Sequence, residues 1–140
     1  MSEQARVRAG DLGAVAKVRL AARIVTSFVV VHVGLRRVSL PELVARLGGG
    51  PRASWPPVRP IRLSRAVHRT LRLGSRRPRC LILALVLYRL LRSQGDRGAL
   101  VIGIPIEARD KDAHAWIEME GHDIGPPPGK GAHEELARYA

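Results

Sequence analysis

The stretch from Cys80 to Leu91 constrains the fold more than any other part of the chain. Its residues are apolar on nearly every side of the helix that they predict, with Arg89 as the one charge. A helix on a protein surface has a single apolar stripe, so a helix that is apolar all round belongs in the centre of a core. A chain of 140 residues is long enough to wrap one domain around it.

The only cysteine of the chain, Cys80, stands at the start of this central helix. Pro78 fits the first helical position, where its missing N–H costs nothing, so Cys80 falls in the first turn. The unpaired N–H groups and the positive end of a helix favour a thiolate, and they can stabilise the oxyanion of an acyl-transfer intermediate. The alternative is an inert packing cysteine, which is the usual state of a buried thiol.

A histidine on a predicted strand supplies a matching base. Residues 113–119 alternate in polarity, so that His114, Trp116 and Glu118 share one face of the strand. A thiol at a helix start and an imidazole on a strand are the nucleophile and the base of cysteine catalysis. The strands predicted in this half are residues 99–104, which are continuously apolar, residues 113–119, and residues 122–125 after a hairpin turn at 120–122.

Three helices are predicted in the first half of the chain. The first has Asp11 as its N-cap and an apolar face made by Val15, Val18, Ala22 and Val25. The periodicity of residues 28–33 leaves open whether they continue this helix or form a strand. The three helices are residues 12–27, residues 42–47 with Ser39 as cap and Pro41 in the first turn, and residues 59–72; the loop 48–60 holds Trp55 as an anchor.

Basic residues concentrate in the first half of a chain whose net charge is +12. Residues 1–79 hold 17 Lys and Arg against 3 Asp and Glu, whereas residues 80–140 hold 7 against 9. This excess predicts an acidic partner, with an ordinary Arg-rich solvated surface as the alternative. Scattered charges and an aromatic content of 4% argue against nucleic acid as that partner. The candidate contacts on the third helix are Arg62, Arg65, Arg69 and Arg72.

Several kinds of site are not expected. One cysteine cannot form an internal disulfide and no secretory signal is recognisable, so we expect a cytoplasmic protein. The longest apolar run, residues 24–35, is shorter than the roughly 20 residues of a membrane span. The histidines and the cysteine lack metal-ligand spacing, so no metal is expected. Residues 125–131 lack the Ser or Thr and the N–H donors of a phosphate loop, so no cofactor is expected.

Three blocks of sequence follow one another in a specific order. They are Arg-Cys-Leu at 79–81 with Tyr-Arg-Leu-Leu-Arg at 88–92, Leu-Val-Ile-Gly at 100–103, and Ala-His-Ala-Trp-Ile-Glu at 113–118. In this order the blocks resemble the leader-peptidase B proteins of lasso-peptide biosynthesis, members of the transglutaminase-like, papain-related superfamily. The resemblance is close over residues 80–121 and looser over residues 10–75.

The resemblance implies an α+β fold, with N-terminal helices and a central Cys-bearing helix packed on a small antiparallel sheet. We expect a single domain over residues 1–140, made of a basic helical part, 1–75, and a catalytic core, 76–140. In this family Cys80 would attack the peptide carbonyl at the leader–core junction of a precursor peptide, and His114 would take and return the proton. A macrolactam synthetase would then close the freed core into a ring. The chain is too short to include a leader-recognition domain, so we expect the split form with a separate small leader-recognition protein.

The orienting acid of the predicted triad has more than one candidate. The family places an acid about twelve positions after the histidine, where this chain has Pro126. Asp123 is preferred because it is the first acid after the strand and faces the same side as His114. A turn at residues 120–121 sets Asp123 opposite Glu118, and a turn at residues 121–122 sets it opposite Glu120. In either register direct contact with the imidazole requires a bulge or a longer turn. The rivals are a backbone carbonyl and, if the C-terminal segment folds back, Glu134 or Glu135.

Two other functions stay open. A transglutaminase-like module without catalysis could bind a peptide or a protein through its basic helices. The Cys–His pair could also perform a different acyl transfer, such as transamidation, in another modified-peptide pathway. Fast alkylation of Cys80 near neutral pH would distinguish a catalytic thiol from a packing one.

Overall fold

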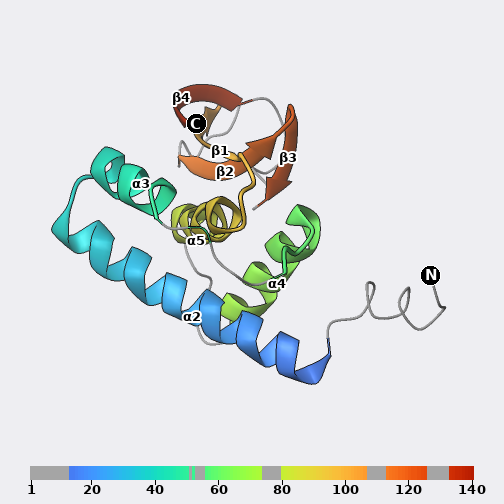
Figure 1. The fold of residues 1–140 in the computed structure, drawn as a ribbon. Coiled ribbons are helices and arrows are strands. Elements are labelled where there is room, and N and C mark those ends of the chain that lie inside the picture. Colours follow the sequence, from blue (N-terminus) through green and yellow to red (C-terminus); the bar gives the residue numbers. More distant parts are fainter. Residues whose placement is uncertain (1–12, 51, 53–55, 74–79, 107–112, 126–132) are drawn as a thin grey trace.

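A computed structural model describes residues 13–50, 52, 56–73, 80–106, 113–125 and 133–140. These residues form four helices and a four-stranded antiparallel sheet, so the predicted α+β class is confirmed (Figure 1). The elements are α2 (Ala14–Arg37), α3 (Leu40–Gly48), α4 (Pro60–Leu73), α5 (Cys80–Ser93), β1 (Ala99–Pro105), β2 (His114–Met119), β3 (His122–Gly125) and β4 (His133–Tyr139).

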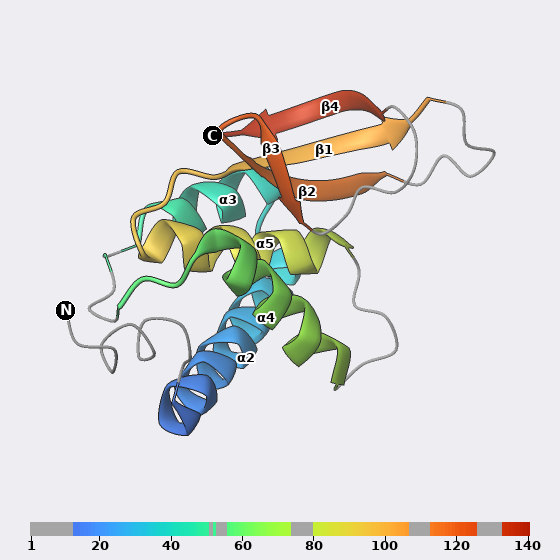
Figure 2. The same cartoon turned by 90° about the vertical axis from the view of Figure 1, so that its right-hand side faces the viewer.

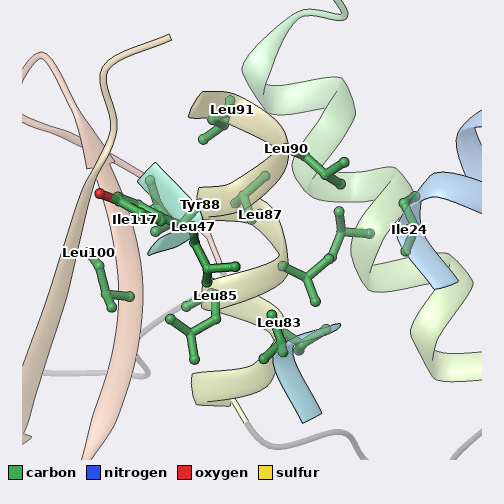
Figure 3. Close-up of a cluster of buried hydrophobic side chains, with 14 of the residues drawn as sticks. Ile24, Leu47, Leu83, Leu85, Leu87, Tyr88, Leu90, Leu91, Leu100 and Ile117 are labelled. Carbon is green, nitrogen blue, oxygen red and sulfur yellow. The ribbon is translucent and has the colours of Figure 1, made fainter. Parts of the chain in front are cut away.

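The central position predicted for α5 is confirmed. Every side chain from Leu83 to Tyr88 is buried, and so are Leu90 and Leu91. In both overall views α5 runs between the sheet on one side and α2 and α4 on the other (Figures 1 and 2). Figure 3 shows its leucines reaching toward Ile24 of α2 in one direction and toward Leu100 and Ile117 of the sheet in the other.

Helix α2 is longer than predicted, because residues 28–33 continue it to Arg37. Its N-cap is Gly13, and the predicted cap, Asp11, lies outside the described residues. The expected apolar face is not the one that packs on the core: the side chains of Val15 and Val18 are 67% and 69% exposed. The buried face is Leu20, Ile24, Ser27 and Val31.

Both sides of α2 are apolar, so the helical period alone could not decide which one packs on the core. The larger aliphatic side chains of Leu20 and Ile24 fill the space against α4 and α5. The buried hydroxyl of Ser27 also accepts a hydrogen bond of 2.6 Å from Nη1 of Arg89, which ties α2 to α5. These contacts select the Leu20–Ile24 side.

Helix α2 is long and apolar enough to cross a membrane, by length and composition alone. The run of residues 24–35 considered from the sequence is therefore part of a longer apolar helix of 24 residues. The side with Leu20 and Ile24 packs on the core, and 22% of the apolar window of the helix is buried.

The other two predicted helices are confirmed within two residues. Ser39 is the N-cap of α3, although its side chain makes no capping hydrogen bond, and Pro41 stands in the first turn. The third predicted helix corresponds to α4. Pro78 and Trp55 lie outside the described residues.

The sheet has the strand order β3-β2-β1-β4. Its face toward α5 carries Leu100, Ala115 and Ile117, which belong to the core. Of the two hairpin registers that the sequence allowed, the structure has the one with the turn at residues 120–121, since Met119 pairs with His122 and Glu118 pairs with Asp123. The sequence did not predict β4, which pairs with the outer edge of β1.

Candidate functional site

The first residue of α5 and the start of β2 meet in the structure. Sγ of Cys80, which is partly buried, lies 3.9 Å from the carbonyl oxygen of Ala113. A thiol is a weak hydrogen-bond donor, so this contact shows that Cys80 lies close to Ala113 but adds little stability. Ala113 directly precedes His114. The packing of α5 on β2 therefore brings together the start of α5, which holds the predicted nucleophile, and the start of β2, which holds the predicted base.

The position of Cys80 at the helix start gives its sulfur an electropositive side. The first amide groups of an α-helix have no acceptor within the helix, and the helix dipole is positive there. These groups of α5 can stabilise a thiolate or the oxyanion of a tetrahedral intermediate. The chemistry that fits this corner of the molecule is therefore acyl transfer by a thiol.

His114 lies on the face of the sheet that turns away from the core side of α5. Its neighbour Ala115 belongs to the core, and strand alternation places the imidazole on the other face. There the ring meets His133 of β4 edge to face, with ring centroids 5.4 Å apart and an interplanar angle of 86°. Trp116 meets the same ring at 5.6 Å. We call His114, Trp116 and His133 the aromatic cluster.

A glycine makes room for the aromatic cluster. Gly103 of β1 pairs with His114. A Cβ atom on Gly103 would lie 2.7 Å from Cη2 of Trp116 and 3.0 Å from the backbone oxygen of Glu134. The indole therefore occupies the space that any side chain at this position would need.

An acidic side chain fixes the indole from the opposite end. Nε1 of Trp116 donates a hydrogen bond of 3.0 Å to Oε1 of Glu118. Nη2 of Arg138 donates to the other carboxylate oxygen at 2.8 Å, and its Nε donates to Glu135 at 2.6 Å. The hydrogen bond from Trp116, followed by that from Arg138, lowers the pKa of Glu118. Glu118 is thus a carboxylate that holds Trp116 and Arg138 in place.

The structure does not bring Asp123, the preferred orienting acid, to His114. Asp123 pairs with Glu118, four residues along β2 from the histidine, which is about 13 Å along a strand. The required bulge does exist, but it lies between Glu118 and Ile117 and leaves Asp123 at the far end of β2. Oδ1 of Asp123 instead accepts a hydrogen bond of 2.9 Å from the N–H of Gly125. Burial raises the pKa of this carboxyl group.

The other two candidate acids, Glu134 and Glu135, lie on β4. The C-terminal segment therefore folds back onto the sheet. Glu135 pairs with Gly103, which pairs with His114 on its other side. Glu135 and His114 thus share one row and one face, and their backbones lie about 10 Å apart across β1. Glu134 pairs with Ile104, on the other face. Pro126, at the family position, lies outside the described residues.

Sequence reasoning missed His133. Its segment, His-Glu-Glu-Leu-Ala-Arg-Tyr at 133–139, has no alternating apolar pattern that would predict a strand. Only the pairing of β4 with β1 carries its ring to His114 and Trp116. Among the described residues no group of three or more His, Cys, Asp or Glu side chains could hold a metal ion.

Comparison with known protein families assigns most of the chain, including the candidate site, to one superfamily. The sequence model of the transglutaminase-like superfamily matches residues 15–138, from α2 to β4. No curated protein and no solved structure matches the chain at a significant level. The match covers both the segment with Cys80 and the segment with His114.

Proposed function

Because the chain belongs to the transglutaminase-like superfamily, which includes cysteine peptidases and acyltransferases, we propose that it is a cysteine peptidase that removes the leader from a ribosomally made precursor peptide. The leader peptidases of lasso-peptide biosynthesis have this activity, and the sequence resembles them. The observation that carries the proposal is the 3.9 Å approach of Sγ of Cys80 to the carbonyl oxygen of Ala113, beside His114.

The reaction follows from the two side chains. The thiolate of Cys80 attacks the carbonyl carbon at the leader–core junction, and the first turn of α5 stabilises the oxyanion. His114, which holds the thiol proton, gives it to the departing amine of the core peptide. A thioester remains between the leader and Cys80. His114 then takes a proton from water, and the resulting hydroxide releases the leader with a free carboxylate.

The imidazole must come within about 3 Å of the sulfur for the first proton transfer. Its ring packs in the aromatic cluster, on the face turned away from the core. Catalytic hydrogen bonds are often long without substrate and tighten when it binds. The proposal therefore requires the imidazole of His114 to move toward Sγ of Cys80 when substrate binds.

The partners of the proposed peptidase are a precursor peptide with its leader, a small leader-recognition protein, and a macrolactam synthetase. The leader-recognition protein presents the leader, and the synthetase consumes the amine that cleavage frees. The basic residues of the first half supply positive charge for an acidic leader or carrier.

A second candidate is a transglutaminase-like module that binds a peptide or a protein without catalysis. Two placements favour it: His114 packs against His133, and Asp123 lies at the far end of β2. A different acyl transfer by the same pair, such as transamidation, uses the chemistry of the first candidate on another acceptor.

The test requires a candidate precursor peptide and a candidate leader-recognition protein, which are sought among the genes beside this one. Mass spectrometry should detect the freed core with the wild-type chain, and neither Cys80→Ala nor His114→Ala should release it. Both variants should keep the circular dichroism spectrum and the unfolding midpoint of the wild type. Cleavage by Cys80→Ala would contradict the cysteine mechanism. Slow alkylation of Cys80 by iodoacetamide, with no cleavage, would favour the binding module.

A further inference from the structure

The outer side of α2 is an apolar surface that nothing in the described part of the chain covers. Figure 1 shows α2 at the edge of the helical layer, on the side away from the sheet. Val25 and Val29 are 50% and 53% exposed, and Val33 is 43% exposed. Contiguous exposed apolar surface of this kind marks an interaction site. We call this surface the valine face; its residues are Val15, Val18, Ala22, Val25, Val29 and Val33.

The spacing of the valine face fits a partner helix. From Val15 to Val29 its residues follow steps of three and four, which is the spacing of a seam between two packed helices. The face lies opposite the core side of α2, which Leu20 and Ile24 form. β-Branched side chains have few rotamers, so they lose little entropy when a helix packs on them.

A groove widens the valine face at its C-terminal end. Its volume is about 1080 Å³, and it lies between α2, α3 and the end of α5. Val29 and Val33 line it together with Leu43 and Leu47 of α3. The cations that line it are Arg23, Arg37, Arg46, Arg52 and Arg89, and no Asp or Glu is among its lining residues.

The charge around this surface specifies the partner. Helix α2 contains Lys and Arg but no Asp or Glu. Arg19, Arg36 and Arg37 of this helix are exposed. A partner with carboxylates along both edges of an apolar helix would complement these charges.

Two other occupants fit less well. A second copy of the chain would set one basic, acid-free helix against another, which is unfavourable. A helix that lies in a membrane surface carries Trp, Phe or Leu on its apolar face. Here the face holds only Val and Ala, and the one aromatic ring of α2 outside its histidine, that of Phe28, packs against the core.

We propose that the valine face and its groove dock an apolar helix flanked by Asp and Glu from a different protein. This inference goes beyond the proposed function, because it requires neither Cys80 nor cleavage of a peptide. The described contacts of α2 with α4 and α5 hold the face in place before the partner arrives. Docking therefore costs little ordering of the chain.

The test measures fluorescence anisotropy with two synthetic three-heptad helical peptides. Both have Val and Leu at the seam positions; one has Glu at the flanking positions, and the other has Lys. The Glu peptide should bind, with an affinity that falls as salt rises, and the Lys peptide should not. Val25→Asp with Val29→Asp should weaken binding at least about tenfold, whereas Leu136→Asp on β4, where the side chain is 56% exposed, should leave it unchanged.

A second pair of variants tests the charges without touching the apolar residues. Arg19→Glu with Arg37→Glu should weaken binding of the Glu peptide, and Arg65→Glu with Arg69→Glu on α4 should not. Weakening by the α4 pair alone would place the acidic partner on α4 and overturn the proposal.

Three further outcomes would also overturn it. One is binding of neither peptide. Another is binding to vesicles of equal parts anionic and zwitterionic lipid without binding of the Glu peptide, which would assign the face to a membrane. The third is a dimer in analytical ultracentrifugation that Val25→Asp with Val29→Asp dissociates, which would assign the face to a second copy.

Discussion

Gly103 and His114 pair directly across β1 and β2, and the indole of Trp116 fills the space beside the glycine. Gly103 has no side chain, and it lies directly beside the proposed base, His114. A side chain at residue 103 would displace Trp116 and, through the cluster, His114 and His133. The shape of the candidate site therefore depends on a residue that has no chemistry of its own.

Gly103→Ala tests this dependence. The added methyl group collides with Trp116 and with the backbone of β4, so we expect a loss of about 1–3 kcal/mol in the free energy of unfolding. Urea denaturation measures it. Gly50→Ala is the control, since a Cβ there meets nothing within 4 Å. Equal effects of both variants would contradict the packing of Trp116 over Gly103.

Trp116→Ala removes the largest side chain of the cluster. Trp116 is buried, so truncation should cost about 3–5 kcal/mol in the free energy of unfolding and should also slow cleavage. Trp116→Phe keeps a ring but loses the hydrogen bond to Glu118. Its stability and its cleavage rate should lie between those of the wild type and those of Trp116→Ala. Chemical denaturation and the cleavage assay give both numbers. A Trp116→Ala chain with unchanged stability and rate would show that the indole is dispensable.

His133 is predicted to position the imidazole of His114 through ring contact. His133→Ala should lower kcat of the peptidase with little change in KM, because the contact acts on the base and not on substrate binding. His133→Phe preserves an aromatic edge and should restore much of the rate. If His133→Phe is as slow as His133→Ala, the ring contact is not what matters.

Glu118 predicts a pH dependence of stability. Its folded-state pKa is lowered, so its contribution is complete above the ordinary value of 4.5 and is lost as the pH falls through the lower folded-state value. The Glu118→Gln chain should thus be less stable than wild type at neutral pH, by up to about 1 kcal/mol, and equally stable in acid. Denaturation across this range measures the difference. A difference that does not vary with pH would point to packing alone.

Asp123→Asn separates stability from catalysis. Burial raises the pKa of Asp123, so its ionisation opposes folding as the pH rises, and the neutral amide should be at least as stable as wild type at pH 7. If Asp123 orients His114 during turnover, Asp123→Asn should cut the cleavage rate by orders of magnitude. Full activity in Asp123→Asn, with an inactive Glu134→Gln or Glu135→Gln, would instead assign the acid to β4.

The sequence predicted the parts of this fold that depend on local pattern. The all-apolar segment at Cys80–Leu91 predicted a central helix, and the turn residues 120–122 left two hairpin registers, of which the structure has the one with the turn at 120–121. The packing side of α2 was predicted wrongly, because two apolar sides compete there and tertiary contacts decide. Strand β4 and His133 escaped prediction, because their positions depend on pairing with β1 across some thirty residues of chain.

Strand β4 also has a protective role. It covers one edge of β1, whose sequence Ala-Leu-Val-Ile-Gly-Ile is rich in β-branched residues and carries no charge. Without β4 that edge would present unpaired N–H and C=O groups beside a segment suited to cross-β stacking. A chain that has not yet added its last strand, during synthesis or after proteolytic trimming, would thus be prone to aggregate through β1. The charged residues of β4, Glu134, Glu135 and Arg138, become the new rim of the sheet and discourage further pairing.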